Sequence, residues 1–370
     1  MKPLLLTIAW GLFLASSWTW CIGMYLPVVM LREYGWAGFL AFALPNVLGC
    51  AAFGWVFTRA RSEQWRSRAG VAMAAFSAVT VAFHVFFLGF VTRGLFATGT
   101  EAAAGTVILL ILLMLGAALA LALAPQRSWP WLGALVYCTS LLAFAIFLDP
   151  LGRSALAAHE WSGVRPLAEL PWLVPTLIFG FLLCPALDLS FHRARRESPS
   201  RMSFLVFGLS FAVILVFTAA YAPALADGVP SLIAAHLASQ SLFTVAVHLR
   251  ELRESRDRGE WSIPRTWLVV GSAAIVGIAA PSESNYLRFL AFYGLIFPAF
   301  VLFSVRSPRG GTRRRGLVLA AIVLLSLPIQ EVGFIEFRTP LLVIPLLAIA
   351  AVVLWPAKTD PLGSVPRLRG

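Results

Sequence analysis

Polar and helix-breaking residues interrupt the first long apolar run of the chain. The run extends from Leu4 to Leu31, about 28 residues, whereas about 20 apolar residues already span a bilayer. Its middle, Ser16–Pro27, contains two Ser, a Thr, two Trp, a Gly and a Pro. At membrane depth, polar groups and broken helices are tolerated where they face a partner or a cavity. The stretch indicates either a broken helix that builds a central site or a long tilted helix with a proline kink.

A second polar group lies on one face of the apolar segment 231–249. Ser239, Gln240 and Thr244 follow His236 by three, four and eight residues, which places all four on one side of a helix. Within an apolar span such a stripe faces the interior of the bundle. It fits either a polar site or hydrogen bonds between helices, which are worth about 0.6 kcal/mol each.

The sixth apolar segment, Trp172–Phe191, is also interrupted, by Gly180 and Pro185. It comes five segments after the first, and because five is odd the two interrupted segments run in opposite directions. Interrupted segments at corresponding positions in two halves of a membrane protein indicate an inverted-repeat transporter. This pairing favours the broken-helix interpretation of Ser16–Pro27.

Three acidic residues have separate interpretations. Asp188 precedes His192 by four residues and lies near Arg193, so we expect it to form a salt bridge or gate latch at the inner interface rather than a proton relay. Glu160 and Glu169 lie in the outer loop before the sixth segment, and a membrane-embedded transferase would use them. Nothing in their spacing orders these two glutamates into a site.

The composition is that of an integral membrane protein. Of 370 residues, 59% are hydrophobic and only 12% are charged, about half the charged fraction of a soluble protein. The four cysteines fall inside apolar runs, and no Cys or His spacing resembles a zinc site. Hydrolase, metalloprotease and phosphate-loop motifs are missing from the sequence, so we do not expect an enzyme.

Twelve apolar segments are long enough, or nearly so, to cross a bilayer. Their approximate bounds are 4–31, 36–57, 71–92, 103–124, 129–148, 172–191, 202–225, 231–249, 266–281, 287–305, 316–333 and 339–355. The loops between them are mostly short, and no soluble domain fits anywhere. We therefore predict a single transmembrane domain over residues 1–370.

The basic residues predict the orientation of these segments. If all twelve span and the N-terminus is inside, 23 of the 29 Lys and Arg residues fall on the inner side. The other six are Arg32, Arg93, Arg153, Arg165, Arg288 and Arg338. This bias follows the positive-inside rule and predicts that both termini are cytoplasmic, in a bacterial-type inner membrane. Topology thus accounts for the net charge of +12, and nucleic acid is not an expected partner.

These features resemble the LeuT-type inverted-repeat fold, in particular the sodium:solute symporters and the wider amino acid–polyamine–cation superfamily. The resemblance rests on the interrupted first and sixth segments and on a Trp-rich first segment followed by Gly35-Trp36 and by Phe42–Gly49, which reads FALPNVLG. It covers about residues 4–305 as topology. The chain departs from the family in its short length, its compact loops and its lack of a complete signature.

The resemblance implies two sets of site residues. In the family, carbonyls of the unwound first helix and hydroxyls of the eighth helix bind sodium, which here implies Trp20, Gly23, Ser239 and Ser241. The substrate-binding candidates come from the interrupted segments and the 231–249 stripe: Ser17, Trp18, Trp20, Gly23, Met24, Tyr25, Phe179, Gly180, Cys184, His236 and Gln240.

We therefore predict an all-α polytopic membrane protein with about twelve transmembrane helices and both ends inside. Its first repeat would cover 1–148 and its second 172–305, in a five-plus-five inverted arrangement, with two additional helices over 316–355.

The expected function is secondary active transport, in which a small neutral or zwitterionic solute is symported with Na⁺ or H⁺ by alternating access. No cofactor is expected apart from this coupling ion, and the expected partners are the lipid bilayer and the solute. A non-transporting scaffold or sensor is the first alternative, and a membrane-embedded transferase is the second. The sequence leaves the oligomeric state open.

Overall fold

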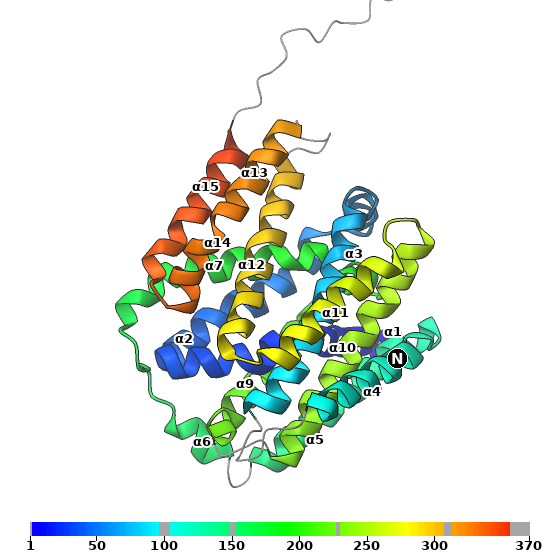
Figure 1. The fold of residues 1–370 in the computed structure, drawn as a ribbon. Coiled ribbons are helices and arrows are strands. Elements are labelled where there is room, and N and C mark those ends of the chain that lie inside the picture. The colour runs from blue at the N-terminus through cyan, green and yellow to red at the C-terminus, as the bar shows by residue number, and fades with distance from the viewer. Residues whose placement is uncertain (1, 96–103, 149–151, 227–229, 307–312, 356–370) are drawn as a thin grey trace, which may run out of the picture.

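The computed structural model of the protein describes residues 2–95, 104–148, 152–226, 230–306 and 313–355. Within these ranges the chain forms helices and no strand (Figure 1). Nine of the described helices are long and apolar enough to cross a membrane, and two more apolar helices, Ile263–Ala279 and Thr339–Leu354, are shorter. The all-α architecture is thus confirmed and fits a multi-pass membrane protein, whereas the number of crossings stays a prediction.

The first apolar run forms α1 (Lys2–Trp18) and the beginning of α2 (Trp20–Val56). Trp20 has a φ of 30°, in the left-handed region that residues other than glycine rarely adopt. The helix therefore breaks at Thr19, inside the stretch where the sequence predicts a break.

Two further features shape α2. The helix continues through Pro27, because the carbonyl that proline leaves without a donor, that of Gly23, accepts a hydrogen bond from Thr218 Oγ1 at 2.9 Å. It kinks at Gly35, whose φ of 62° and ψ of −153° are open essentially to glycine alone. Before Gly35, α2 completes the first apolar segment, and after it α2 forms the second.

The sixth apolar segment is broken as predicted. It forms α7 (Leu170–Leu183), a 3₁₀ turn η5 (Cys184–Leu187) and the short helix α8 (Leu189–Glu197). The break occurs around Pro185, whereas Gly180 stays inside α7.

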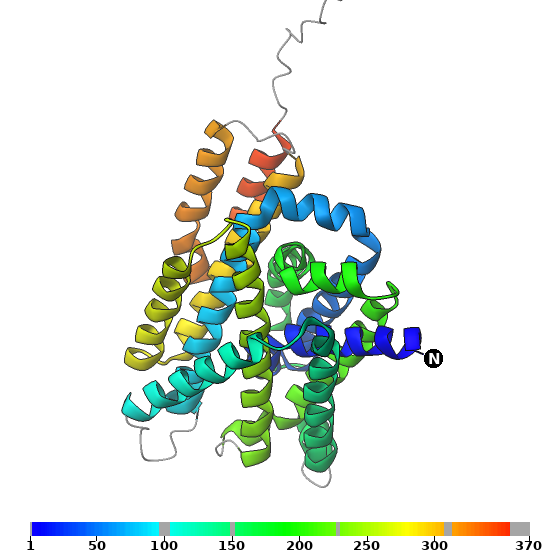
Figure 2. The same cartoon turned by 90° about the vertical axis from the view of Figure 1, so that its right-hand side faces the viewer.

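The other elements extend along the bundle and at its edges. In chain order they are α3 (Arg59–Phe90), η1 (Val91–Leu95), α4 (Ala104–Ala122), η2 (Gln126–Ser128), α5 (Trp129–Phe147), α6 (Arg153–Ala158), η4 (Leu167–Glu169), α9 (Ser203–Tyr221), η6 (Pro223–Ala226), α10 (Ser231–Asp257), α11 (Ile263–Ala279), α12 (Glu283–Arg306), α13 (Arg313–Leu325), α14 (Leu327–Gln330), η7 (Glu331–Ile335), η8 (Thr339–Leu342) and α15 (Val343–Leu354). Figures 1 and 2 show α13 and α15 at one edge, where Val323 and Ile349 pack with Leu295 of α12.

Loops contact one another at two ends of the bundle. At the basic end, as we call it, Arg59 donates a hydrogen bond to the Ser198 carbonyl and Arg250 donates one to the Ala124 carbonyl. At the opposite end, the loop after α6 binds the kink of α2. The predicted inner loops that the structure describes between α2 and α10 thus contact one another at the basic end.

Candidate functional site

The two helix breaks meet at a partly enclosed cavity of about 40 Å³. The start of α2, the last turns of α7, the middle of α12 and residues near the C-terminal helices form its walls. Most of the lining side chains are apolar or aromatic, and none of them carries a charge. The cavity therefore suits an uncharged molecule or an uncharged part of one.

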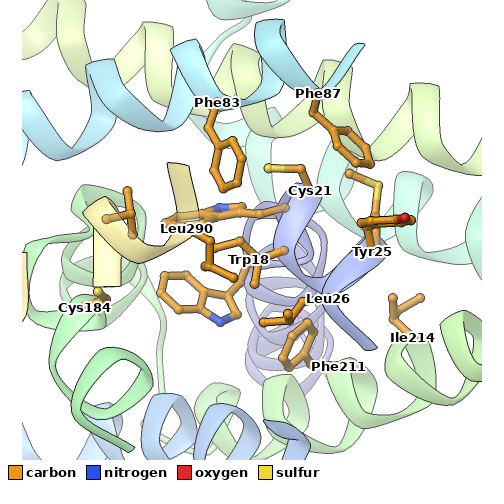
Figure 3. Close-up of a cluster of buried hydrophobic side chains, with 14 of the residues drawn as sticks. Trp18, Cys21, Tyr25, Leu26, Phe83, Phe87, Cys184, Phe211, Ile214 and Leu290 are labelled. Carbon is orange, nitrogen blue, oxygen red and sulfur yellow. The ribbon is translucent and has the colours of Figure 1, made fainter. Parts of the chain in front are cut away.

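Five predicted substrate-binding residues line this cavity: Trp18, Trp20, Phe179, Gly180 and Cys184. The two indole rings lie 4.5 Å apart, and Figure 3 shows Trp18 beside Leu290. Both indole N–H groups have partners, since that of Trp18 donates to Asn46 Oδ1 at 2.9 Å and that of Trp20 donates to the Ser17 carbonyl. The indoles therefore offer ring surface to the cavity rather than hydrogen bonds.

Two glycines keep the cavity open. A Cβ atom at Gly180 would lie 3.9 Å from the Cα atom of Gly294. A Cβ atom at Gly294 would meet no atom of the described residues within 4 Å beyond its own stretch of helix. Both glycines line the cavity. A larger side chain at either position would therefore occupy the cavity before it displaced a helix.

Two polar atoms of the lining lack partners. Thr176 Oγ1 and Gln330 Oε1 are buried, and neither has a hydrogen-bond partner within the described part of the chain. Sequence reasoning missed both residues as site candidates. The signal for Gln330 was a polar side chain within segment 316–333, but nothing in the sequence places that segment against α7.

Side chains from three other helices satisfy the backbone at the first break. The N–H of Cys21 donates to His84 Nε2 of α3 at 3.3 Å, and the Cys21 carbonyl accepts from the Tyr286 hydroxyl of α12 at 3.1 Å. Thr244 Oγ1 of α10 donates to the Ser16 carbonyl at 3.3 Å. These contacts hold the break in one conformation.

The four predicted cation-site residues do not converge at this break. Trp20 lies there, and the Gly23 carbonyl is occupied by the hydroxyl from α9. Ser239 donates to a carbonyl of its own helix, and Ser241 lines a separate groove between α3, α4 and α10. The α10 hydroxyl that reaches the break belongs to Thr244.

His236 and Gln240 lie at the contact between α10 and α5 and are not part of the cavity lining. His236 Nδ1 is 2.9 Å from Ser140 Oγ, and Gln240 Nε2 donates to the same oxygen at 2.8 Å. The His236 ring packs 4.8 Å from that of Phe217. In the structure, this part of the polar stripe makes hydrogen bonds between helices, which is one of its two predicted interpretations.

The remaining predicted residues lie along the broken helix. Ser17 Oγ is 3.4 Å from Ser190 Oγ of α8, so it touches the second break. Met24 is buried, and its carbonyl accepts a hydrogen bond from α9. The Tyr25 hydroxyl reaches the opposite end, where it donates to Glu283 Oε2 at 2.7 Å.

An ion-pair network closes the opposite end. Arg32 of α2 binds both carboxylate oxygens of Glu283, the first residue of α12, at 2.6 and 2.9 Å. Glu33, which is buried, binds Arg32 at 2.8 Å and Arg165 at 2.6 Å. The network thus joins α2 to α12 and to the loop after α6.

A second network closes the basic end. Arg193 of α8 binds Glu251 of α10 through a short contact, Glu254 at 2.7 Å and Glu197 at 3.1 Å. Burial raises the pKa of the Glu197 carboxyl, and the positive charge of Arg193 opposes this rise. The network joins the second helix break to α10.

Asp188 does not form the predicted inner salt bridge. Arg193 binds the three glutamates, and His192 binds Ser62 Oγ at 2.7 Å through Nδ1. Asp188 Oδ1 instead accepts the backbone N–H of Ser190 at 2.7 Å and caps α8. The prediction was wrong because a capping side chain folds back onto the first turn of its own helix and not toward the next turn.

The two loop glutamates lie in separate contacts. The Glu160 carbonyl accepts the N–H of Trp36 at 3.0 Å. Glu169 Oε2 is 3.4 Å from the Tyr34 hydroxyl, and its carbonyl accepts a hydrogen bond from Thr339. Neither carboxylate lines the cavity.

Comparisons with protein-family models, with curated proteins and with solved structures found no match. The site is therefore described by its own geometry. It is a small uncharged cavity between two broken helices, with an ion-pair network at each end of the molecule.

Proposed function

We propose that the protein is a secondary active transporter, in which a small neutral or zwitterionic solute is symported with a cation by alternating access. The observation that carries the proposal is the meeting of two broken helices at one cavity. Broken helices at membrane depth are the usual binding site of inverted-repeat transporters. The proposed five-plus-five arrangement of 1–148 and 172–305, the two additional helices and the inner-membrane location belong to the same proposal.

The lining supports the proposed class of solute. Trp18, Trp20 and Phe179 offer aromatic surface, while Thr176 and Gln330 offer polar atoms that lack partners. A few well-placed polar groups in an apolar lining are typical of small-molecule sites. Because no lining side chain is charged, a strongly anionic or cationic solute would lack a counter-charge.

The cavity volume supports a cycle of opening and closing. A water molecule needs about 10–15 Å³ of such volume, so about 40 Å³ holds only a few waters. A larger solute needs the cavity to widen, which would occur when one end of the bundle opens. The two ion-pair networks are the groups that must part, because each joins a broken helix to α10 or α12.

Solute uptake into proteoliposomes, measured across a panel of neutral and zwitterionic compounds, tests this function. Gly180→Leu and Gly294→Leu should abolish uptake, because both side chains would fill the cavity. Gly271→Leu is the matched control, since Gly271 is exposed on α11 and a Cβ atom there would meet no atom of the described residues within 4 Å beyond its own stretch of helix. Failure of the wild-type protein to accumulate any compound under Na⁺ or H⁺ gradients would reject the proposal.

A non-transporting scaffold or sensor is the second candidate, and the first helix break favours it. Fixed side chains satisfy the backbone of Ser16 and Cys21, as they would in a helix that never moves. If the protein is a scaffold, neither the wild type nor any variant takes up solute, and Gly180→Leu still binds the partner. Gly23→Leu is a poor test of either function, because a Cβ atom at Gly23 would face Phe211 of α9 at 3.4 Å, away from the cavity.

A further inference from the structure

Asp188 is a carboxylate at the second helix break that the site described above does not use. It lies between η5 and α8 and its side chain is fully buried. One carboxylate oxygen, Oδ1, accepts the N–H of Ser190 at 2.7 Å, and the Ser190 hydroxyl and the Phe191 N–H also interact with the carboxylate. The other, Oδ2, is buried and has no hydrogen-bond partner in the part of the chain that the structure describes.

No cationic side chain in the described part of the chain forms an ion pair with Asp188, and the buried guanidinium on α3, that of Arg66, acts on Glu251 and His192. The titratable neighbours of Asp188 on the elements packed around it are Cys184 of η5, Cys50 of α2, Tyr293 of α12 and Glu251 of α10. All four are acids, so none supplies a positive charge. The two bases nearest in sequence on α8 are held by other partners, as described above.

A proton resolves the electrostatic problem of this carboxylate. An ionised carboxylate without a cation or a full set of hydrogen bonds is far costlier to bury than the neutral acid. The oxygen without a donor directed at it, Oδ2, is the one that takes the proton. Access of water to the break would favour the ionised form and release the proton.

A sodium ion fits Oδ2 less well. Hard cations bind several oxygen ligands, whereas the nearby titratable groups include the thiols of Cys50 and Cys184. The carbonyls at the first break already accept hydrogen bonds from hydroxyl groups. A proton needs one oxygen only.

Asp188 is connected to the cavity from two sides. Ser190, whose N–H binds Asp188, lies 3.4 Å from Ser17 through the two hydroxyl oxygens. The Ser17 carbonyl accepts the indole N–H of Trp20, which lines the cavity, as does Cys184 in the turn before Asp188. A change of charge at Asp188 therefore acts on both helix breaks.

We propose that Asp188 is the proton-binding residue that couples transport to a proton gradient. Oδ2 takes a proton from water when one end of the bundle is open, and the O–H bond breaks when the other end opens and water accepts the proton. Each cycle thus moves the proton across without any other chemical change. This inference rests on the transport function proposed above and assigns its coupling ion.

Infrared spectroscopy of the purified full-length protein tests the proton site without any solute. We expect the wild-type protein at neutral pH to show the C=O band of a buried carboxylic acid, and Asp188→Asn to lose it. Asn still caps α8 through its side-chain oxygen, so this variant should fold. Asp257→Asn is the control and should keep the band, because Asp257 is exposed and paired with Arg256. Identical wild-type and Asp188→Asn spectra in this region would overturn the proton site.

An imposed pH gradient across proteoliposomes tests the coupling. The gradient should accelerate solute uptake by the wild type and by Asp257→Asn, and Asp188→Asn should lose this acceleration. Uptake driven by a Na⁺ gradient alone, and abolished in Asp188→Asn, would make Asp188 a sodium ligand and refute the proposal. If the wild type transports no solute at all, the transport function and the coupling role fail together, whereas the infrared band still decides whether Asp188 holds a proton.

Discussion

The ion-pair networks at the two ends of the bundle differ in burial. At the basic end, the side chains of Arg193 and Glu251 are 4% and 1% exposed. At the opposite end, those of Arg32 and Glu283 are 45% and 30% exposed. The same kind of pair is therefore dry at one end and half-solvated at the other.

This difference predicts which end opens more easily. Exposed ion pairs contribute about 0–1 kcal/mol, because water and salt compete with them. A buried pair is different, since loss of one partner leaves an uncompensated charge in a dry site. We therefore expect the opposite end to open at a lower cost than the basic end, and four experiments test this order.

Arg193→Met should have the largest effect. It leaves Glu251 buried without its closest partner, which lowers the free energy of unfolding by about 3–5 kcal/mol. The thermal-unfolding midpoint in detergent measures the loss. The double variant Arg193→Met/Glu251→Met should recover most of it, because an apolar pair replaces the ionic one. Equal unfolding midpoints for the single and double variants would mean that the lost stability does not come from an unpaired buried charge on Glu251.

Gly35→Ala should have the second-largest effect. Its backbone conformation costs a residue with a Cβ atom about 1–3 kcal/mol, and that atom would lie 2.6 Å from the Glu160 carbonyl oxygen. Gly259→Ala separates the two causes, because Gly259 has a φ of 72° but a Cβ atom there would meet no atom of the described residues within 4 Å beyond its chain neighbours. We expect the unfolding midpoint to fall further for Gly35→Ala. A similar fall of the midpoint for both variants would show that the contact with the Glu160 carbonyl adds nothing to the cost of the backbone conformation.

Arg32→Gln should lower stability by less than Arg193→Met, because buried Glu33 keeps Arg165 as a partner and the pair of Arg32 with Glu283 is partly exposed. It should nevertheless open the opposite end more often. Cys184 reports this opening, since it is buried and lines the cavity. In a Cys138→Ser background, which removes the exposed thiol, a water-soluble maleimide should label Cys184 faster in Arg32→Gln than in the parent. Mass spectrometry identifies the labelled residue. Unchanged labelling would contradict a gating role for this pair.

Arg288→Gln should have the smallest effect. Arg288 and Glu331 form an ion pair at the same end, and their side chains are 48% and 38% exposed. We expect a loss well below about 1 kcal/mol that disappears at high salt, together with unchanged labelling of Cys184. If this variant labelled as fast as Arg32→Gln, the effect would be one of surface charge and not of the contact between α2 and α12.

Glycine and proline in the sequence predicted that both helices break, and Pro185 lies at the second break itself. Contacts with residues far along the chain decided which of these residues interrupts its helix. Pro27 leaves α2 unbroken because Thr218, 191 positions later, binds the carbonyl that proline frees. The break occurs instead at Thr19, before a Trp with positive φ, which no propensity predicts.

The site was predictable only in part, for a related reason. Helical spacing placed His236 and Gln240 on one face, but it does not say which neighbour that face meets, and Ser140 of α5 is that neighbour. The spacing of Asp188 predicted a partner on the next turn, whereas a helix N-terminus competes for the same carboxylate. Gln330 reaches the cavity through tertiary packing alone.

The loop after α6 connects the two broken helices at the opposite end. Around the kink at Gly35, the N–H groups of Trp36 and Ala37 bind loop carbonyls at 3.0 and 3.2 Å, and the carbonyls of Arg32 and Glu33 accept loop N–H groups at 3.1 and 2.9 Å. This loop leads directly into α7. Because the loop is hydrogen-bonded to α2 and continues into α7, we expect a tilt of α2 before its kink to move the start of α7 as well.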